Sequence, residues 1–67
     1  MAREMQFFMD LIRGYAEHKN STAGDILTIW DDLDISKVIY DKYDEYRSKS
    51  LEDVFKDIDK LSAEKQN

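Results

Sequence analysis

The side chains that could take part in catalysis are few, and their spacing fits no nucleophilic site. The chain has one histidine, His18, and no cysteine. A catalytic histidine needs a nucleophile within hydrogen-bond reach and a third group that orients it. The nearest hydroxyls, on Ser21 and Thr22, fall in a turn that we expect to be exposed. A histidine at a helix C-terminus also has a plain role, because its positive charge suits the helix dipole. We therefore expect no enzyme activity and no catalytic residue.

The residues that could bind a metal form an incomplete motif. Asp32, Asp34 and Ser36 have the spacing that opens a calcium-binding loop. The sixth position of such a loop should be glycine and the twelfth should be glutamate, whereas this chain has Lys37 and Tyr43. The absence of cysteine also excludes a cysteine-based zinc site. We expect no metal and no cofactor.

The acidic residues are concentrated in the middle of the chain. Residues 25–45 hold seven acids against Lys37 and Lys42, which equals the whole net charge of −5. Such a segment is either a solvated face or a surface that attracts a basic protein. Tyr40 lies at the edge of the apolar stripe of its helix, where a tyrosine suits a wet interface. The residues that we predict to contact a partner are Asp31, Asp34, Tyr40, Asp41, Asp44 and Glu45.

Other classes of partner fit the sequence less well. An acidic surface repels phosphate backbones and anionic lipid, so nucleic acid is an unlikely partner. No run approaches the roughly 18 apolar residues that a membrane span requires. The first residues lead directly into an amphipathic pattern with no apolar signal-peptide region. We expect a cytoplasmic protein that does not bind a membrane.

The elements that carry these residues are predicted to be helices. The 67 residues include no proline and only two glycines, and no run alternates apolar and polar residues with period two. We expect an all-α fold, a small bundle of three to four short helices with tight turns, in a single domain over 1–67. The expected ranges are 2–19, 23–32, 35–47 and 51–63. Asn20 is expected to end the first helix. Ser21 or Thr22 is expected to cap the start of the second helix, Asp34 the third and Ser50 the fourth.

The apolar residues recur at helical spacing and predict the core. The expected core positions are Met5, Phe8, Met9, Ile12, Tyr15, Ala16, Ile26, Leu27, Trp30, Leu33, Ile35, Ile39, Tyr43, Tyr46, Leu51, Val54, Phe55, Ile58 and Leu61. Phe7, Leu11, Gly14 and His18 form a second flank of the first helix. A glycine inside a helix is costly, and close approach of another helix would explain it. That helix could be internal or could belong to a second copy in a homodimer.

Several short motifs give the chain a resemblance to a known family. They are Phe8, Ile12, Tyr15-Ala16-Glu17-His18-Lys19-Asn20, Ser21-Thr22-Ala23-Gly24, Leu33-Asp34-Ile35, Ile39-Tyr40-Asp41, Tyr43, Tyr46 and Phe55-Lys56-Asp57-Ile58-Asp59. In these the chain resembles a family of small bacterial proteins, domain of unknown function 3791. Many members have a histidine-containing turn where this chain has residues 47–50. The resemblance implies an antitoxin-like or accessory binding role and supplies no catalytic residues.

Three functional hypotheses follow. The first is a small, non-enzymatic protein-binding module that uses the acidic segment against a basic partner. The second is a homodimeric structural protein paired through Phe7, Leu11, Gly14 and His18. The third is a helix-turn-helix-like DNA-binding regulator, which is disfavoured because the expected recognition helix carries Asp41, Asp44 and Glu45.

Overall fold

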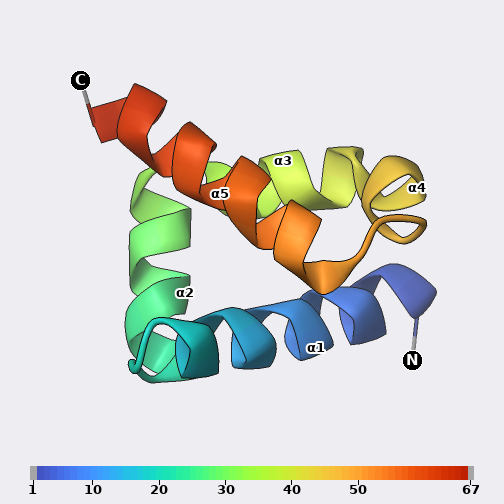
Figure 1. The fold of residues 1–67 in the computed structure, drawn as a ribbon, viewed down its shortest axis with the longest axis horizontal. Coiled ribbons are helices and arrows are strands. Elements are labelled where there is room, and N and C mark those ends of the chain that lie inside the picture. The colour runs from blue at the N-terminus through green and yellow to red at the C-terminus, as the bar shows by residue number, and fades with distance from the viewer. Residues whose placement is uncertain (1, 67) are drawn as a thin grey trace.

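The structure, a computed structural model, describes residues 2–66 and is built from helices without any strand in that range. This confirms the all-α prediction. The helices in chain order are α1 Arg3–His18, α2 Ala23–Asp32, α3 Ile35–Asp41, α4 Tyr43–Tyr46 and α5 Leu51–Gln66 (Figure 1).

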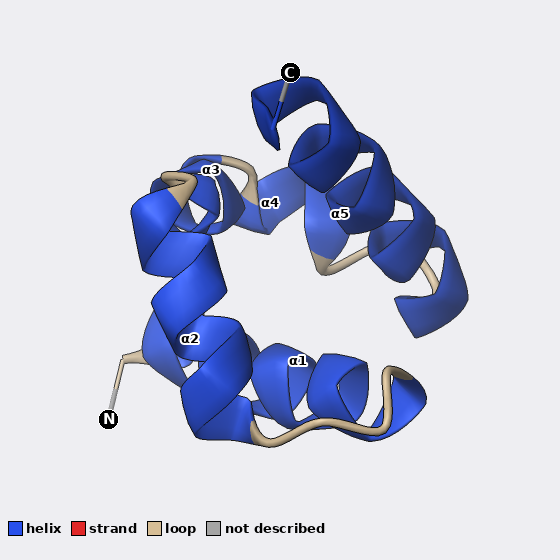
Figure 2. Ribbon diagram, turned by 90° about the vertical axis from the view of Figure 1, so that its left-hand side faces the viewer, coloured by secondary structure: helices blue, strands red, loops and turns tan. Residues whose placement is uncertain are grey.

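The last helix closes the fold. In Figure 1, α2 rises from the end of α1 nearly at a right angle, and α3 and α4 return above α1. Helix α5 packs against both α1 and α3. Turned by 90°, the same helices surround a shared interior (Figure 2). Each helix contributes at least one side chain to that interior.

The turn between α1 and α2 has the predicted chemistry. Asn20 takes a left-handed conformation with φ 57°, which an asparagine tolerates better than most residues. The Ser21 N–H donates to the Ala16 carbonyl at 2.8 Å, and the Asn20 N–H donates to the carbonyl of Glu17. This pair of bonds is a Schellman motif, which satisfies the last carbonyls of α1. The Thr22 hydroxyl then accepts the N–H of the third residue of α2 at 3.2 Å and caps that helix.

The turn between α2 and α3 differs from the prediction. Asp34 stands at the N-cap position, but its carboxylate makes no capping hydrogen bond. It takes a left-handed conformation with φ 61°, and its N–H donates to the Asp31 carbonyl at 3.2 Å. Asp34 therefore acts as the terminating residue of α2, a role that aspartate can fill because it tolerates this region.

The prediction of one continuous helix over residues 35–47 is wrong. It divides at Lys42 into α3 and the single turn α4. In a straight helix of 100° per residue, Lys42 would fall in the middle of the apolar arc, between Val38 and Ile39. The bend leaves Lys42 exposed, with its ammonium 5.9 Å from the centre of the Tyr46 ring. The Tyr46 side chain is then free to enter the core, where it is 1% exposed.

Among residues 2–66, thirteen buried hydrophobic residues form the core, and they correct part of the prediction. They are Phe8, Leu11, Ile12, Tyr15, Ala16, Ile26, Trp30, Ile35, Ile39, Tyr46, Val54, Phe55 and Ile58. Met5, Leu27 and Leu51 were expected inside and are exposed instead, whereas Leu11 is buried. The buried arc of α1 is rotated by about 30° from the predicted one, because α1 contacts α5 on one side as well as α2 on the other.

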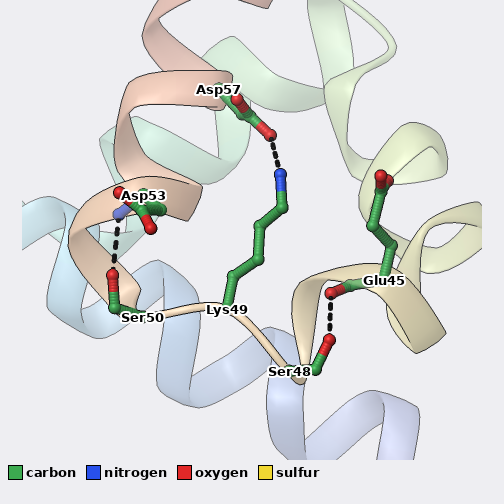
Figure 3. Close-up of polar contacts among 6 residues, drawn as sticks. All are labelled: Glu45, Ser48, Lys49, Ser50, Asp53 and Asp57. Carbon is green, nitrogen blue, oxygen red and sulfur yellow. Dashed lines mark hydrogen bonds and ion pairs between the residues drawn. The ribbon is translucent and has the colours of Figure 1, made fainter.

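The α5 N-terminus supplies a prediction on stability. The Ser50 hydroxyl accepts the Asp53 N–H at 3.2 Å (Figure 3), as the sequence predicted. Ser50→Ala should lower the free energy of unfolding by about 1 kcal/mol, because a helix N–H then loses its partner. Urea unfolding followed by circular dichroism measures this. The control is Ser50→Asn, since asparagine caps as well as serine, and equal losses in both variants would contradict a capping role.

Candidate protein-binding surface

The six predicted partner-binding residues are all exposed and lie on consecutive elements. Asp31 is the last residue but one of α2, Asp34 lies in the following turn, and the other four belong to α3 and α4. In Figure 1 this stretch runs from the end of α2 through α3 to α4. The structure thus brings together, on one continuous stretch of short helices, most of the acids that produce the net charge.

The carboxylates on this stretch keep much of their hydrogen-bonding capacity. Asp31 accepts a hydrogen bond from the Ser36 hydroxyl at 2.9 Å, which supports the α2–α3 turn. The Asp44 carboxylate is 89% exposed and 3.6 Å from the Arg47 guanidinium, a pair of little energetic weight. Glu45 takes part in the next turn through its backbone carbonyl, which accepts from the Ser48 hydroxyl at 2.9 Å (Figure 3). A carboxylate offers about four acceptor sites, so each of these groups has room for a partner.

Tyr40 is the aromatic residue of this surface, and packing against the core fixes the position of its ring. Its ring stacks on the Phe8 ring with the centres 5.0 Å apart and the planes at 18°. Phe8 is in turn packed edge-on against Trp30 at 5.7 Å. Tyr40 is nevertheless 40% exposed. A fixed, half-exposed aromatic side chain loses little conformational freedom when a partner covers it, which is the property of an interface anchor.

The flank predicted as a dimer interface is filled from within the chain. Leu11 has no exposed surface, so in this structure the chain itself covers that side chain. A homodimer paired through this flank stays a prediction. Phe7 packs edge-on against an α4 tyrosine ring at 5.4 Å. A Cβ added at Gly14 would lie 3.4 Å from the Phe55 ring, and His18 stacks on that ring at 5.1 Å. The close approach that explains the glycine is therefore the internal helix α5.

Sequence analysis missed a polar contact between α1 and α5. The Tyr15 hydroxyl donates to the Asp59 carboxylate at 2.5 Å, and the Lys19 ammonium lies 3.0 and 3.1 Å from the two oxygens of the same carboxylate. Burial works against the charged form of Asp59, but the hydrogen bonds from Tyr15 and Lys19 outweigh it and lower its pKa. Burial, together with the bond to Asp59, raises the pKa of Tyr15.

A second polar contact joins the α4–α5 turn to α5. The Lys49 ammonium donates to the Asp57 carboxylate at 3.0 Å (Figure 3). Asp57 and Asp59 thus bind different parts of the chain, while Ile58 between them is fully buried. The Asp57-Ile58-Asp59 motif, which is among the segments that carry the family resemblance, is explained by packing. The signal in the sequence was an apolar residue between two acids on a core-facing helix.

The chemistry available elsewhere is limited. Within residues 2–66, no group of three or more histidine or carboxylate side chains is placed to hold a metal ion. None of the helices in that range combines the length and the apolar character needed to cross a bilayer. Asp32 and Asp34, whose spacing resembles the start of a calcium-binding loop, lie at the exposed end of α2 and in the turn that follows it.

Truncation of Leu11 tests the internal filling of the flank. Leu11→Ala should lower the free energy of unfolding by about 2–5 kcal/mol, the range for a leucine removed from a packed core. The urea midpoint of both proteins should stay constant when protein concentration is raised a hundredfold. A midpoint that rises with concentration in the parent chain and not in the variant would instead place Leu11 in an interface between copies.

The Tyr15–Asp59 hydrogen bond predicts a dependence of stability on alkaline pH. Because folding raises the pKa of Tyr15, its contribution is complete below about pH 10 and is lost as the pH rises toward the folded pKa. Between pH 10 and 11, Tyr15→Phe should lose about 1 kcal/mol less stability than the parent chain. Urea unfolding at both pH values measures this, with Tyr40→Phe as the control at the surface. Equal losses in the parent and in Tyr15→Phe would contradict the linkage.

Comparison with known proteins gives a family and no function. Searches of curated proteins and of solved structures find no match. A family model described as "Protein of unknown function (DUF3791)" matches residues 6–65, which covers all five helices except the ends of α1 and α5. The match includes both contacts of the Asp57-Ile58-Asp59 motif and the whole acidic stretch. The chain belongs to the DUF3791 family.

Proposed function

We propose that this protein is a non-enzymatic helical module that binds a basic surface of another protein through the stretch from the end of α2 to α4. The observation that carries the proposal is the exposure of Asp31, Asp34, Asp41, Asp44 and Glu45 on consecutive elements beside a stacked Tyr40. The rest of the chain is electrically balanced, since residues 25–45 account for the full net charge of −5.

The charge and the tyrosine have different roles in this proposal. Exposed carboxylates accelerate the encounter with a basic surface and disfavour acidic competitors, an effect that salt screens within about 10 Å at 0.1 M. Buried contact with an aromatic ring supplies affinity that salt does not remove. Binding should therefore weaken with salt without disappearing. An antitoxin-like or accessory role, which the family resemblance implies, would use this same surface.

Charge reversal tests the proposal. The double variant Asp41→Lys/Asp44→Lys should lose a basic protein that the tagged parent chain retains from the extract of its native cells at low salt. Mass spectrometry identifies the retained protein, and titration of the purified pair should show binding weakened at least about tenfold, because two attractive contacts become repulsive. Neither side chain is buried, so the fold should be unaffected.

The matched control is Glu17→Lys/Glu64→Lys, which changes the net charge equally at exposed acids outside the stretch. This variant should retain the partner with an affinity within about threefold of the parent chain at 0.1 M salt. If both double variants weaken binding equally, net charge alone is responsible and the proposed surface is wrong. If neither does, the partner binds elsewhere.

A further inference from the structure

A shallow groove lies between α1 and α2, next to the acidic stretch. It has a volume of about 310 Å³ and is lined by Phe8, Met9, Ile12 and Arg13 of α1, together with Leu27 and the first two residues of α2. Leu27 is 40% exposed although its type and spacing suit a core position. Of the apolar side chains that line the groove, Leu27 is exposed and Met9 is half-buried, whereas Phe8 and Ile12 belong to the core.

The groove continues toward Tyr40 through Phe8. Phe8 both lines the groove and stacks under Tyr40 at 5.0 Å. On α1, Met5 precedes Met9 by one helical turn and therefore lies on the same side of the helix. Met5 is also exposed. Methionine side chains adapt their shape to an apolar partner, which suits a binding surface.

The charges at the groove differ between its two ends. Asp31 follows Leu27 by four residues, so it lies on the same side of α2, at the C-terminal end of that helix. Arg13 lies at the other end, beside Ala23 and Gly24. The two ends are about 10 Å apart along α2, at 1.5 Å per residue. The acidic end merges with the stretch that the proposed function assigns to a basic partner.

We infer that the α1–α2 groove seats an amphipathic helix of the partner, with its apolar side on Met9 and Leu27 and a basic side chain at Asp31. The inference rests on the proposed function and names the kind of segment that the basic partner inserts. An amphipathic helix lies in such a groove through apolar residues spaced three and four apart.

Helix α2 offers a matched pair of variants. Leu27 and Ile29 are exposed to a similar degree, 40% and 44%, and belong to the same helix. They lie on opposite sides of the buried stripe of α2, because Ile29 faces a hollow shared with Tyr15 and Lys19. Leu27→Gln removes an apolar contact from the groove, whereas Ile29→Gln makes the same kind of change outside it.

The probe is a synthetic amphipathic peptide of about 18 residues, long enough to form a helix on binding, with leucine on one side and lysine on the other. One control peptide replaces every lysine with glutamate, and a second scrambles the lysine–leucine order. Titration into the full chain, followed by amide chemical shifts, gives the affinity and the site. We expect the lysine peptide alone to bind and to shift the amides of Met9, Gly24 and Leu27.

The variants then separate this inference from the proposed function. Leu27→Gln should weaken peptide binding at least about fivefold, and Ile29→Gln less than about twofold. In one outcome, Asp41→Lys/Asp44→Lys abolishes binding of the identified natural partner, while Leu27→Gln leaves the affinities for the partner and for the peptide unchanged. That outcome overturns the groove inference and leaves the proposed function standing. If Leu27→Gln weakens both and the double charge reversal weakens neither, the groove stands and the acidic surface is wrong. Failure of the lysine peptide to bind, or equal binding of the glutamate peptide, also overturns the inference.

Discussion

The fold depends on the packing of α5 against α1. Helix α5 covers the part of α1 around Gly14 and Tyr15, and the Trp30 ring of α2 also contacts the Tyr15 ring, at 5.4 Å. Two interactions hold this contact. The Phe55 ring packs against Tyr15 at 5.5 Å and fills the space opposite Gly14. Asp59 accepts from Tyr15 and Lys19 at the edge of the same contact.

That contact also decides which surfaces of α1 remain free. Phe55 of α5 lies against Gly14 and an α4 tyrosine packs on Phe7, whereas Met9 of α1 lines the groove on the side of α2. A domain of this size buries only about 60% of its unfolded surface, and some apolar side chains must stay outside. Here Leu27 and the half-buried Met9 line one groove, and the acidic stretch begins one turn beyond Leu27, at Asp31.

The local features of the fold were predictable from the sequence. The packing of one helix against another was predictable only in part. The breaks at Asn20 and Ser50 and the start of α2 follow from short-range hydrogen bonds, which residue type determines within three or four positions. The exposure of the acids also follows from residue type. The bend at Lys42 and the burial of Leu11 depend on which other helices pack against the helix that carries them. Apolar periodicity predicts which side of a helix is buried, but it does not predict which helix covers that side.

The candidate site shows the same division. Asp41, Asp44 and Tyr40 were found from charge and spacing alone. The α1–α2 groove was not predicted, because the apolar type and the spacing of Leu27 indicate a core residue. Leu27 is exposed because of the position of α1 beside α2. The Tyr15–Asp59 contact joins residues 44 positions apart, which no local pattern encodes.

Helix α4 is a single turn of four residues and is too short to persist without tertiary contacts. Its direction is set by Tyr46, whose ring is buried in the core, while Asp44 and Glu45 beside it face the solvent. The orientation of two surface charges is thus inherited from an interior side chain. A screen that scores variants by affinity alone would therefore report Tyr46 as a contact residue, although no partner could touch it. Substitutions in the interior and on the proposed recognition surface should therefore be interpreted together.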